Sequence, residues 1–259
     1  MPLQNILAIF RRELASAVDQ PLAYLLVPIY GILVGGFSLW FDDVFSTGTA
    51  SMRGVFFWSG FFLLILVPAL TMRVFAEERR SGTIEILSTL PISEAELVSG
   101  KFLATLSLVL LLIASTLGYP LMLAALSTPL AGDDAAPFLI RMFTECGLDW
   151  GPVCGGYLGL ALLGAALTAI GLGCSASTAN PIVAFLTALA LTTFPYVLGL
   201  FLDRVPQTLL PLFQYVSFSY HFDNLARGVI DLRDLVFWVG LTGLGLHAAV
   251  WTLERRRLE

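Results

Sequence analysis

The feature that most constrains the fold is a run of 53 residues, 150–202, that contains no Asp, Glu, Lys or Arg. A helix that crosses the ~30 Å hydrocarbon core of a bilayer needs about 20 mostly apolar residues. The run is therefore long enough for two crossings. Small polar residues that end in Asn180-Pro181 divide it, because Asn-Pro favours a turn. We expect an integral membrane protein.

Apolar segments of the same kind recur along the chain. Of the 259 residues, 57% are hydrophobic and 13% are charged, against about 25% charged in a typical soluble domain. The pattern predicts an all-α, polytopic membrane protein, with one transmembrane domain over 1–259. Pro120 predicts a kink in the third span. The six predicted spans are 21–41, 54–72, 102–126, 151–174, 181–202 and 235–253.

The segment before the first span has helical periodicity. Apolar residues recur at three- and four-residue spacing over 3–18, with polar residues on the other side. Pro21 disfavours continuing this helix. We expect an interfacial helix over 1–20; a cytosolic helix packed on a partner is the alternative. The apolar run that begins at Pro21 lacks a convincing signal-peptide cleavage site, so it is predicted to be a retained span.

The distribution of basic residues predicts the orientation, because Lys and Arg concentrate on the cytoplasmic side. With both termini inside, the inner side holds nine of these residues: Arg11, Arg12, Arg73, Arg79, Arg80, Lys101, Arg255, Arg256 and Arg257. The outer side then holds five: Arg53, Arg141, Arg204, Arg227 and Arg233. Cytoplasmic N- and C-termini are therefore predicted.

Several classes of chemistry lack a motif. The only Gly-Lys pair, Gly100-Lys101, lacks the other residues of a phosphate-binding loop, and no His-Glu-x-x-His or Gly-x-Ser-x-Gly occurs. We therefore expect neither an enzyme nor a cofactor or metal site in this chain. No basic block suggests nucleic-acid binding. The three cysteines (Cys146, Cys154 and Cys174) are read as small buried residues, and no disulfide is assigned.

A secondary transporter is the main rival class. Ion-coupled carriers commonly use ionisable groups within their spans, because such groups are costly there and are retained for function. The predicted spans offer only His247, and the chain shows no internal repeat of the kind common in those folds. Both observations favour a pathway that is driven from outside the spans.

The predicted inner loop, 73–101, contains a short bracketed helix. Gly82 is a plausible end for the helix that leaves the second span, and Thr83–Leu90 is then held between Gly82 and Pro91. Ser93 and Glu96 form a capping-box pattern at the start of the next helix. The chemistry alone allows a docking helix for a partner or a solvated connector.

The predicted outer loop, 203–234, begins with an apolar run, 206–218, that is too short to span. Asp223, Arg227 and Asp231 are four residues apart, so one helix could hold both ion pairs on one face. We expect a re-entrant helical hairpin; an amphipathic helix flat on the outer leaflet is the alternative. His221 is expected to make ordinary hydrogen bonds.

Three segments carry a family resemblance. The inner loop holds a spaced set of residues: Arg73, Phe75, Glu77, Glu78, Gly82, Thr83, Glu85, Leu87, Pro91, Ile92, Ser93, Gly100 and Lys101. Together with His221–Asp234, and with Arg12-Glu13 followed by Pro21, Ala23 and Tyr24, this set resembles type-2 ABC transporter permeases. The gliding-motility-associated subfamily is the most similar.

The resemblance implies a permease without its own ATPase domain. ATP and Mg would bind a separate ABC ATPase subunit, and a second permease copy or related chain would complete the path. Thr83–Leu90 would be the coupling helix. The implied ATPase-coupling residues are Glu77, Glu78, Arg79, Gly82, Thr83, Glu85, Leu87 and Pro91; those of the outer re-entrant loop are His221, Asp223, Arg227 and Asp231.

The resemblance also predicts a location and a direction. The expected location is the bacterial inner membrane, and the expected function is export driven by the partner ATPase. Membrane lipid and an auxiliary envelope subunit are further expected partners. The alternative is a membrane anchor or mechanical coupling subunit of an envelope complex that transports nothing.

Overall fold

The computed structural model describes residues 2–19, 21–41, 51–83, 92–128 and 147–257. Its elements there are helical, with no strand among them, which confirms the predicted all-α class. In chain order they are α1 (Pro2–Val18), α2 (Pro21–Phe41), α3 (Arg53–Thr71), α4 (Ala76–Arg80), α6 (Glu94–Ser115), α7 (Gly118–Ser127), α9 (Trp150–Ser177), α10 (Pro181–Leu200), the 3-10 turn η1 (Leu202–Arg204), α11 (Leu210–Val216), α12 (Phe218–Ala226) and α13 (Leu232–Arg257).

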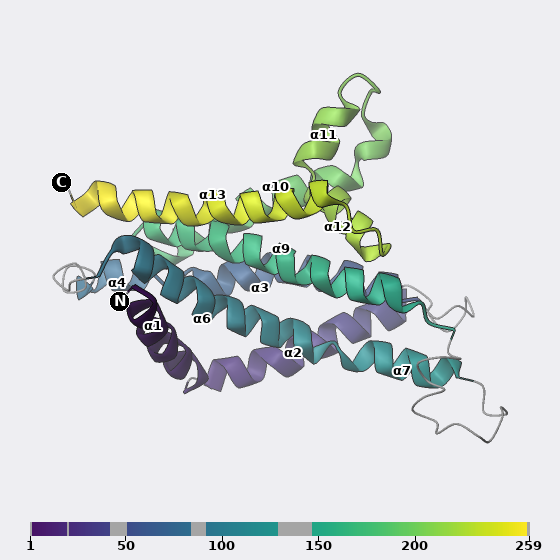
Figure 1. Ribbon diagram of the computed structural model, residues 1–259, viewed down its shortest axis with the longest axis horizontal. Helices are drawn as coiled ribbons and strands as arrows, with labels where there is room; N and C mark the ends of the chain where they lie inside the picture. The colour runs from purple at the N-terminus through teal and green to yellow at the C-terminus, as the bar shows by residue number, and fades with distance from the viewer. Residues whose placement is uncertain (1, 20, 42–50, 84–91, 129–146, 258–259) are drawn as a thin grey trace.

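Six helical segments of the described chain are long and apolar enough to cross a membrane, as predicted. They are α2, α3 with α4, α6 with α7, α9, α10 and α13. Both termini and α4 lie at one end of the bundle, here called the stalk end, whereas α7, α11 and α12 lie at the opposite, distal end (Figure 1). Asn180, predicted to lie in a turn, caps α10: its Oδ1 accepts the Ile182 N–H at 3.0 Å.

The third crossing is kinked, as Pro120 predicts. Helix α6 ends at Ser115 and α7 begins at Gly118. A helical proline donates no backbone hydrogen bond, and its ring clashes with the carbonyl four residues earlier, which here belongs to Thr116. The hydroxyl of Tyr157 in α9 donates to that carbonyl at 2.8 Å. The same carbonyl also accepts the Tyr119 N–H at 3.0 Å, so the bond from Tyr157 uses its second acceptor site and fastens the junction of α6 and α7 to α9.

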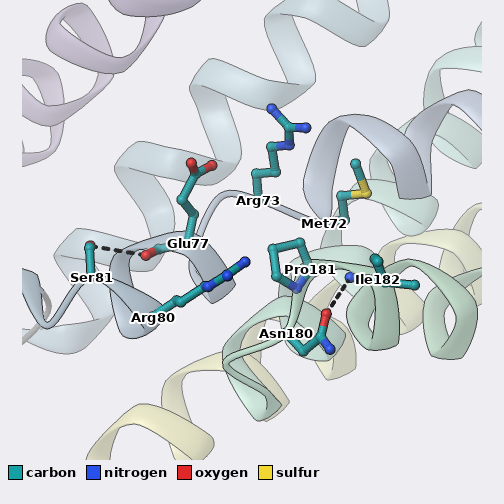
Figure 2. Close-up of a pocket in the computed structure, with 8 residues that line it drawn as sticks. All are labelled: Met72, Arg73, Glu77, Arg80, Ser81, Asn180, Pro181 and Ile182. Atoms are coloured by element: carbon teal, nitrogen blue, oxygen red, sulfur yellow. Dashed lines mark hydrogen bonds between the residues drawn. The ribbon is translucent and has the colours of Figure 1, made fainter.

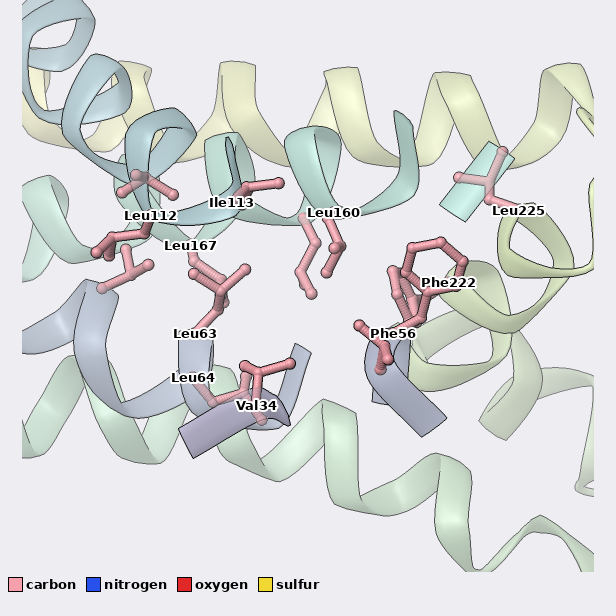
Figure 3. Packing of buried hydrophobic residues seen from close by; sticks show 14 of the residues in the cluster. Val34, Phe56, Leu63, Leu64, Leu112, Ile113, Leu160, Leu167, Phe222 and Leu225 are labelled. Atoms are coloured by element: carbon pink, nitrogen blue, oxygen red, sulfur yellow. The ribbon is translucent and has the colours of Figure 1, made fainter. Parts of the chain in front are cut away.

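Helix α9 forms the centre of the bundle and packs against α3, α6, α10, α12 and α13. Leu63 from α3 and Leu112 from α6 meet Leu160 and Leu167 of α9 in the apolar core (Figure 3). Glycines allow the closest approaches, as is usual between helices in membranes. A Cβ on Gly171 would lie 2.1 Å from the Thr71 hydroxyl of α3.

Helix α1 packs one face on the first turns of α6. A Cβ on Gly100 would lie 2.7 Å from the Ile9 side chain, so the glycine permits this approach. Asn5 donates to Glu96 Oε2 at 3.2 Å, and Glu96 completes the predicted capping box with Ser93. The opposite face of α1 leaves Leu3, Leu7 and Val18 exposed.

Candidate functional site

The segment that leaves α3, Met72–Gly82, is here called the stalk, and it includes α4. Its first turn is held by one buried hydroxyl from α9. Ser175 Oγ accepts the N–H groups of Phe75 and Ala76, each at 3.1 Å, and donates to the Met72 carbonyl at 3.0 Å. These backbone groups have no helical partner where α3 turns into α4, so Ser175 satisfies them. The turn is thereby fixed to α9.

The next contact is a buried lysine. Lys101 of α6 is 2% exposed, and its Nζ lies 2.7 Å from Glu78 Oε1, 3.3 Å from Glu13 Oε1 and 3.2 Å from the Val74 carbonyl. An ammonium group has three hydrogens to donate, and all three have acceptors here. Phe75 lies beneath the charge, with Nζ 5.2 Å from its ring centroid. Lys101 therefore joins α1, the stalk and α6.

The electrostatics explain why this lysine is tolerated. Burying a charge is costly unless the charge is paired and hydrogen-bonded. The Glu13 and Glu78 side chains, which are 30% and 21% exposed, bring negative charge to the ammonium, while Glu78 Oε2 is buried without a hydrogen-bond partner in the described chain. Arg79 adds another fastening by donating to the Ala176 carbonyl of α9. Three helices outside the stalk thus hold it in place.

The residues that were predicted to couple the ATPase fall into different environments where the structure describes them. Glu78 pairs with Lys101, and the Arg79 side chain donates to the Ala176 carbonyl of α9. The Glu77 side chain is exposed. Gly82 has φ +73°, a left-handed conformation that ends the helix as predicted. The Thr83 hydroxyl donates to the Glu78 carbonyl at 3.2 Å. The predicted residues Glu85, Leu87 and Pro91, and nearly all of Thr83–Leu90, lie outside the described residues.

Sequence reasoning missed the roles of Glu13 and Ser175, and it gave Lys101 only a place in a motif. One signal for Lys101 was available, because it is the only lysine in the chain and it opens a long apolar segment. A charge in that position needs a partner. No comparable signal marks Ser175 among the small residues that surround it.

A cavity of about 570 Å³ separates the stalk from the first turn of α10 (Figure 2). The side chains of Arg73, Glu77 and Arg80 are exposed, and Arg80 extends toward Pro181. Within the described chain, the guanidinium groups of Arg73 and Arg80 form no hydrogen bond and no ion pair. The lining residues are Met72, Arg73, Glu77, Arg80, Ser81, Asn180, Pro181 and Ile182.

The distal end holds a second polar cluster, around His221. The imidazole is 1% exposed, with Nδ1 2.6 Å from Asp234 Oδ1 and Nε2 3.1 Å from the Tyr215 carbonyl. Because a carbonyl only accepts, the geometry requires a hydrogen on Nε2 and another in the bond to Asp234. The ring stacks on Phe237 at 3.9 Å between centroids. His221 thus makes the expected hydrogen bonds and joins α11, α12 and α13.

The expectation that one helix holds Asp223, Arg227 and Asp231 is wrong. Helix α12 ends at Ala226, and Gly228 adopts φ +82° against the start of α9. A Cβ on Gly228 would lie 2.9 Å from the Pro152 nitrogen. Asp231 instead starts α13: its carboxylate accepts the Arg233 N–H at 2.9 Å. A glycine-dependent chain reversal therefore overrides the four-residue spacing.

Asp223 lines a distal cavity of about 450 Å³ between α3, α9 and α12, together with Arg53, Asp149 and Arg227. Burial raises the pKa of the Asp223 carboxyl, while the charges of Arg227 and Arg53 lower it in part. No direct ion pair joins Asp223 to either arginine within the described chain. The cavity is therefore lined by two positive and two negative groups together with apolar side chains.

Other candidate groups stand apart from these clusters. Cys154 and Cys174 are free, and Cys146 lies outside the described residues. The expectation of buried cysteines is wrong for Cys154, which is exposed, and Cys174 is only half-buried. His247 is exposed on α13. Across the part of the chain that is described, no three His, Cys, Asp or Glu side chains gather as a metal site would require.

Comparison with models of protein families assigns most of the chain to a family. A family model described as "ABC-2 family transporter protein" matches residues 40–253. The matched region begins near the end of α2 and includes the stalk, Lys101, Ser175 and the His221 cluster. No curated protein matches the chain.

Proposed function

Because the chain belongs to the ABC-2 family of transporter proteins, we propose that it is the permease subunit of an exporter that a separate ATPase subunit drives. At the coarser level the chain is a multi-pass membrane permease of an ABC transporter. The observation that carries the finer proposal is the fastening of the stalk to α1, α6 and α9. Such a stalk can pass a displacement to the membrane helices.

The proposed path of the displacement starts at Thr83–Leu90, the coupling helix that contacts the ATPase. Motion there reaches α6 and α1 through Lys101, which touches Glu78 and Glu13. It reaches α9 through Ser175 and through the bond from Arg79 to the Ala176 carbonyl. Because α9 packs on most of the other crossings, its displacement would rearrange the bundle.

The proposal includes a location and an assembly. The stalk end and both termini face the cytoplasm of a bacterium, and the distal end faces outward across the inner membrane. ATP and Mg bind the partner ATPase, and a second permease chain completes the path. Helices α11 and α12 form the re-entrant outer hairpin. The His221–Asp234 segment and the stalk motif support placement near the gliding-motility-associated permeases.

The proposal is tested by co-purification with an ATPase that carries a phosphate loop and is encoded by a neighbouring gene. The tagged wild-type permease is expected to retain this ATPase. Deletion of Thr83–Leu90, or the substitution Glu85→Arg, should abolish its retention. Asp203→Arg, a matched charge reversal at an exposed distal residue, should have no effect. Retention after the deletion would contradict the assignment of the coupling helix.

A further inference from the structure

The distal cavity between α3, α9 and α12 contains charges of both signs that do not pair with one another. Its volume is about 450 Å³, which lies within the range of small-molecule sites, about 300–1,000 Å³. Arg53 and Arg227 line it, and within the described chain neither guanidinium group forms a hydrogen bond or an ion pair. The cavity therefore offers two cationic groups to a molecule that enters it.

The two carboxylates of the distal cavity are not equivalent. Asp149 caps α9, because its Oδ1 accepts the Gly151 N–H at 3.0 Å. The half-buried carboxylate of Asp223 accepts no hydrogen bond within the part of the chain that is described. A carboxylate that loses water without gaining a hydrogen bond is destabilising. Asp223 is therefore the acid that would gain more from a cationic group of a ligand.

Apolar side chains from two helices form another part of the lining. Phe56 of α3 and Phe222 of α12 are buried, and Phe57 of α3 is half-buried. Apolar surface that leaves water contributes about 25 cal/mol per Å². An apolar body placed against these rings would therefore add to the attraction that the charged groups provide.

The mixture of charges discriminates between classes of ligand. A simple anion would be repelled by Asp149 and Asp223, and a simple cation by Arg53 and Arg227. A wholly apolar molecule would displace water from all four groups and return no hydrogen bond to them. A molecule that carries both charges on an apolar body avoids each of these costs.

From the unpaired charges, the partly buried acid and the apolar lining, we propose that the distal cavity binds a zwitterion of the class of an apolar α-amino acid. Its ammonium group contacts Asp223, its carboxylate contacts Arg53 and Arg227, and its side chain lies against the phenylalanine rings. The proposal goes beyond the proposed ATPase-driven function and needs only this fold. Its failure would therefore leave the ATPase coupling intact.

The test measures binding of radiolabelled L-phenylalanine to the purified full chain in neutral detergent micelles by equilibrium dialysis. Saturable binding is expected. Three competitors each lack one part of the ligand: phenethylamine has no carboxylate, 3-phenylpropionate has no ammonium group, and glycine has no ring. Each should compete at least about fivefold more weakly than unlabelled L-phenylalanine, since one partly exposed ion pair contributes up to such a factor.

Substitutions in the cavity should change the preference between these probes. Asp223→Asn should weaken binding of L-phenylalanine about tenfold, as expected for a hydrogen bond to a charged group. It should not weaken binding of 3-phenylpropionate, which has no ammonium group to lose. Arg227→Gln should weaken binding of L-phenylalanine about fivefold and should not weaken that of phenethylamine. A variant that merely unfolds would lose all of the probes together.

Two matched controls remove exposed charges that lie at the distal end but outside the cavity. Asp203→Asn and Arg233→Gln should leave binding of L-phenylalanine unchanged. Absence of saturable binding up to about 10 mM, a free energy of only about −3 kcal/mol, would overturn the proposal. Equal competition by L-phenylalanine, phenethylamine and 3-phenylpropionate would do the same. So would a loss of binding in Arg233→Gln as large as that in Arg227→Gln.

Discussion

At the scale of single residues, two titratable side chains define the two ends of the molecule. Lys101 gathers Glu13, Glu78 and the Val74 carbonyl at the stalk end. Asp223 lies partly buried beside a distal cavity, near Arg53 and Arg227, and forms an ion pair with neither of them in the described chain. The Lys101 ammonium is fully paired, whereas the Asp223 carboxylate is incompletely paired. Removing the charge of Lys101 should therefore lower the stability of the fold, and removing that of Asp223 should raise it.

Lys101→Met should destabilise the fold by about 3 kcal/mol, because removal of one member of a buried ion pair leaves the others uncompensated. The estimate lies at the low end of the usual range, since both glutamate side chains are partly exposed. Denaturant unfolding in micelles measures the loss. The double variant Lys101→Met/Glu78→Gln should recover part of it. A single variant as stable as wild type would show that the cluster is structurally neutral.

Asp223→Asn should raise the melting temperature at pH 7 and change it less at pH 4. Burial raises the folded-state pKa of this carboxyl, so the folded protein holds the proton more tightly than the unfolded chain. The contribution of Asp223 to stability is then complete below the ordinary aspartate pKa and is lost as the pH rises through the folded-state value. A difference between the two proteins that is the same at both pH values would contradict this account.

At the scale of elements, the sequence predicts the helices better than their contacts. Charge-free length locates the six crossings, and Pro120 locates the kink, because both effects are local. The fastening of the stalk depends on Glu13, which pairs with Lys101, and on Ser175, which accepts the Phe75 N–H. These partners are far apart in the sequence and meet only after folding. The spacing of Asp223, Arg227 and Asp231 misleads for the same reason: Gly228 turns the chain against α9.

The contact between α9 and α13 provides a test of packing at this scale. A Cβ on Gly245 would lie 2.8 Å from the Ala169 backbone carbon, whereas a Cβ on Gly243 would meet nothing within 4 Å. Gly245→Ala should therefore cost about 1–3 kcal/mol through overpacking. Gly243→Ala should be neutral or stabilising by up to ~1 kcal/mol through helix propensity. Equal effects on unfolding in micelles would contradict the close approach of these helices.

At the scale of the whole molecule, the two ends of the bundle have different chemistry. The stalk end combines both termini, the Lys101 cluster and the cavity beside α10 (Figures 1 and 2). The distal end has the His221 cluster and the cavity beside Asp223. In the described chain, the links from the stalk to α1, α6 and α9 form a continuous set of contacts into the core.

The orientation of the bundle can be tested by thiol labelling in intact cells. In a chain whose native cysteines are replaced, Ser81→Cys should react only with a reagent that crosses the inner membrane. Asp203→Cys should react with a reagent that cannot cross it. Both side chains are exposed and lie outside the apolar crossings. The reverse labelling pattern would place the stalk outside and remove the ATPase from its proposed site.

The central claim is that a partner ATPase moves this bundle through the stalk. The most direct measurement is the distance between spin labels at Asp203 and Arg233 of the distal end, in the assembled permease–ATPase complex. The distance distribution should change between the nucleotide-free and ATP-trapped states. An intact complex with identical distributions in both states would contradict the claim and support a membrane anchor that transports nothing.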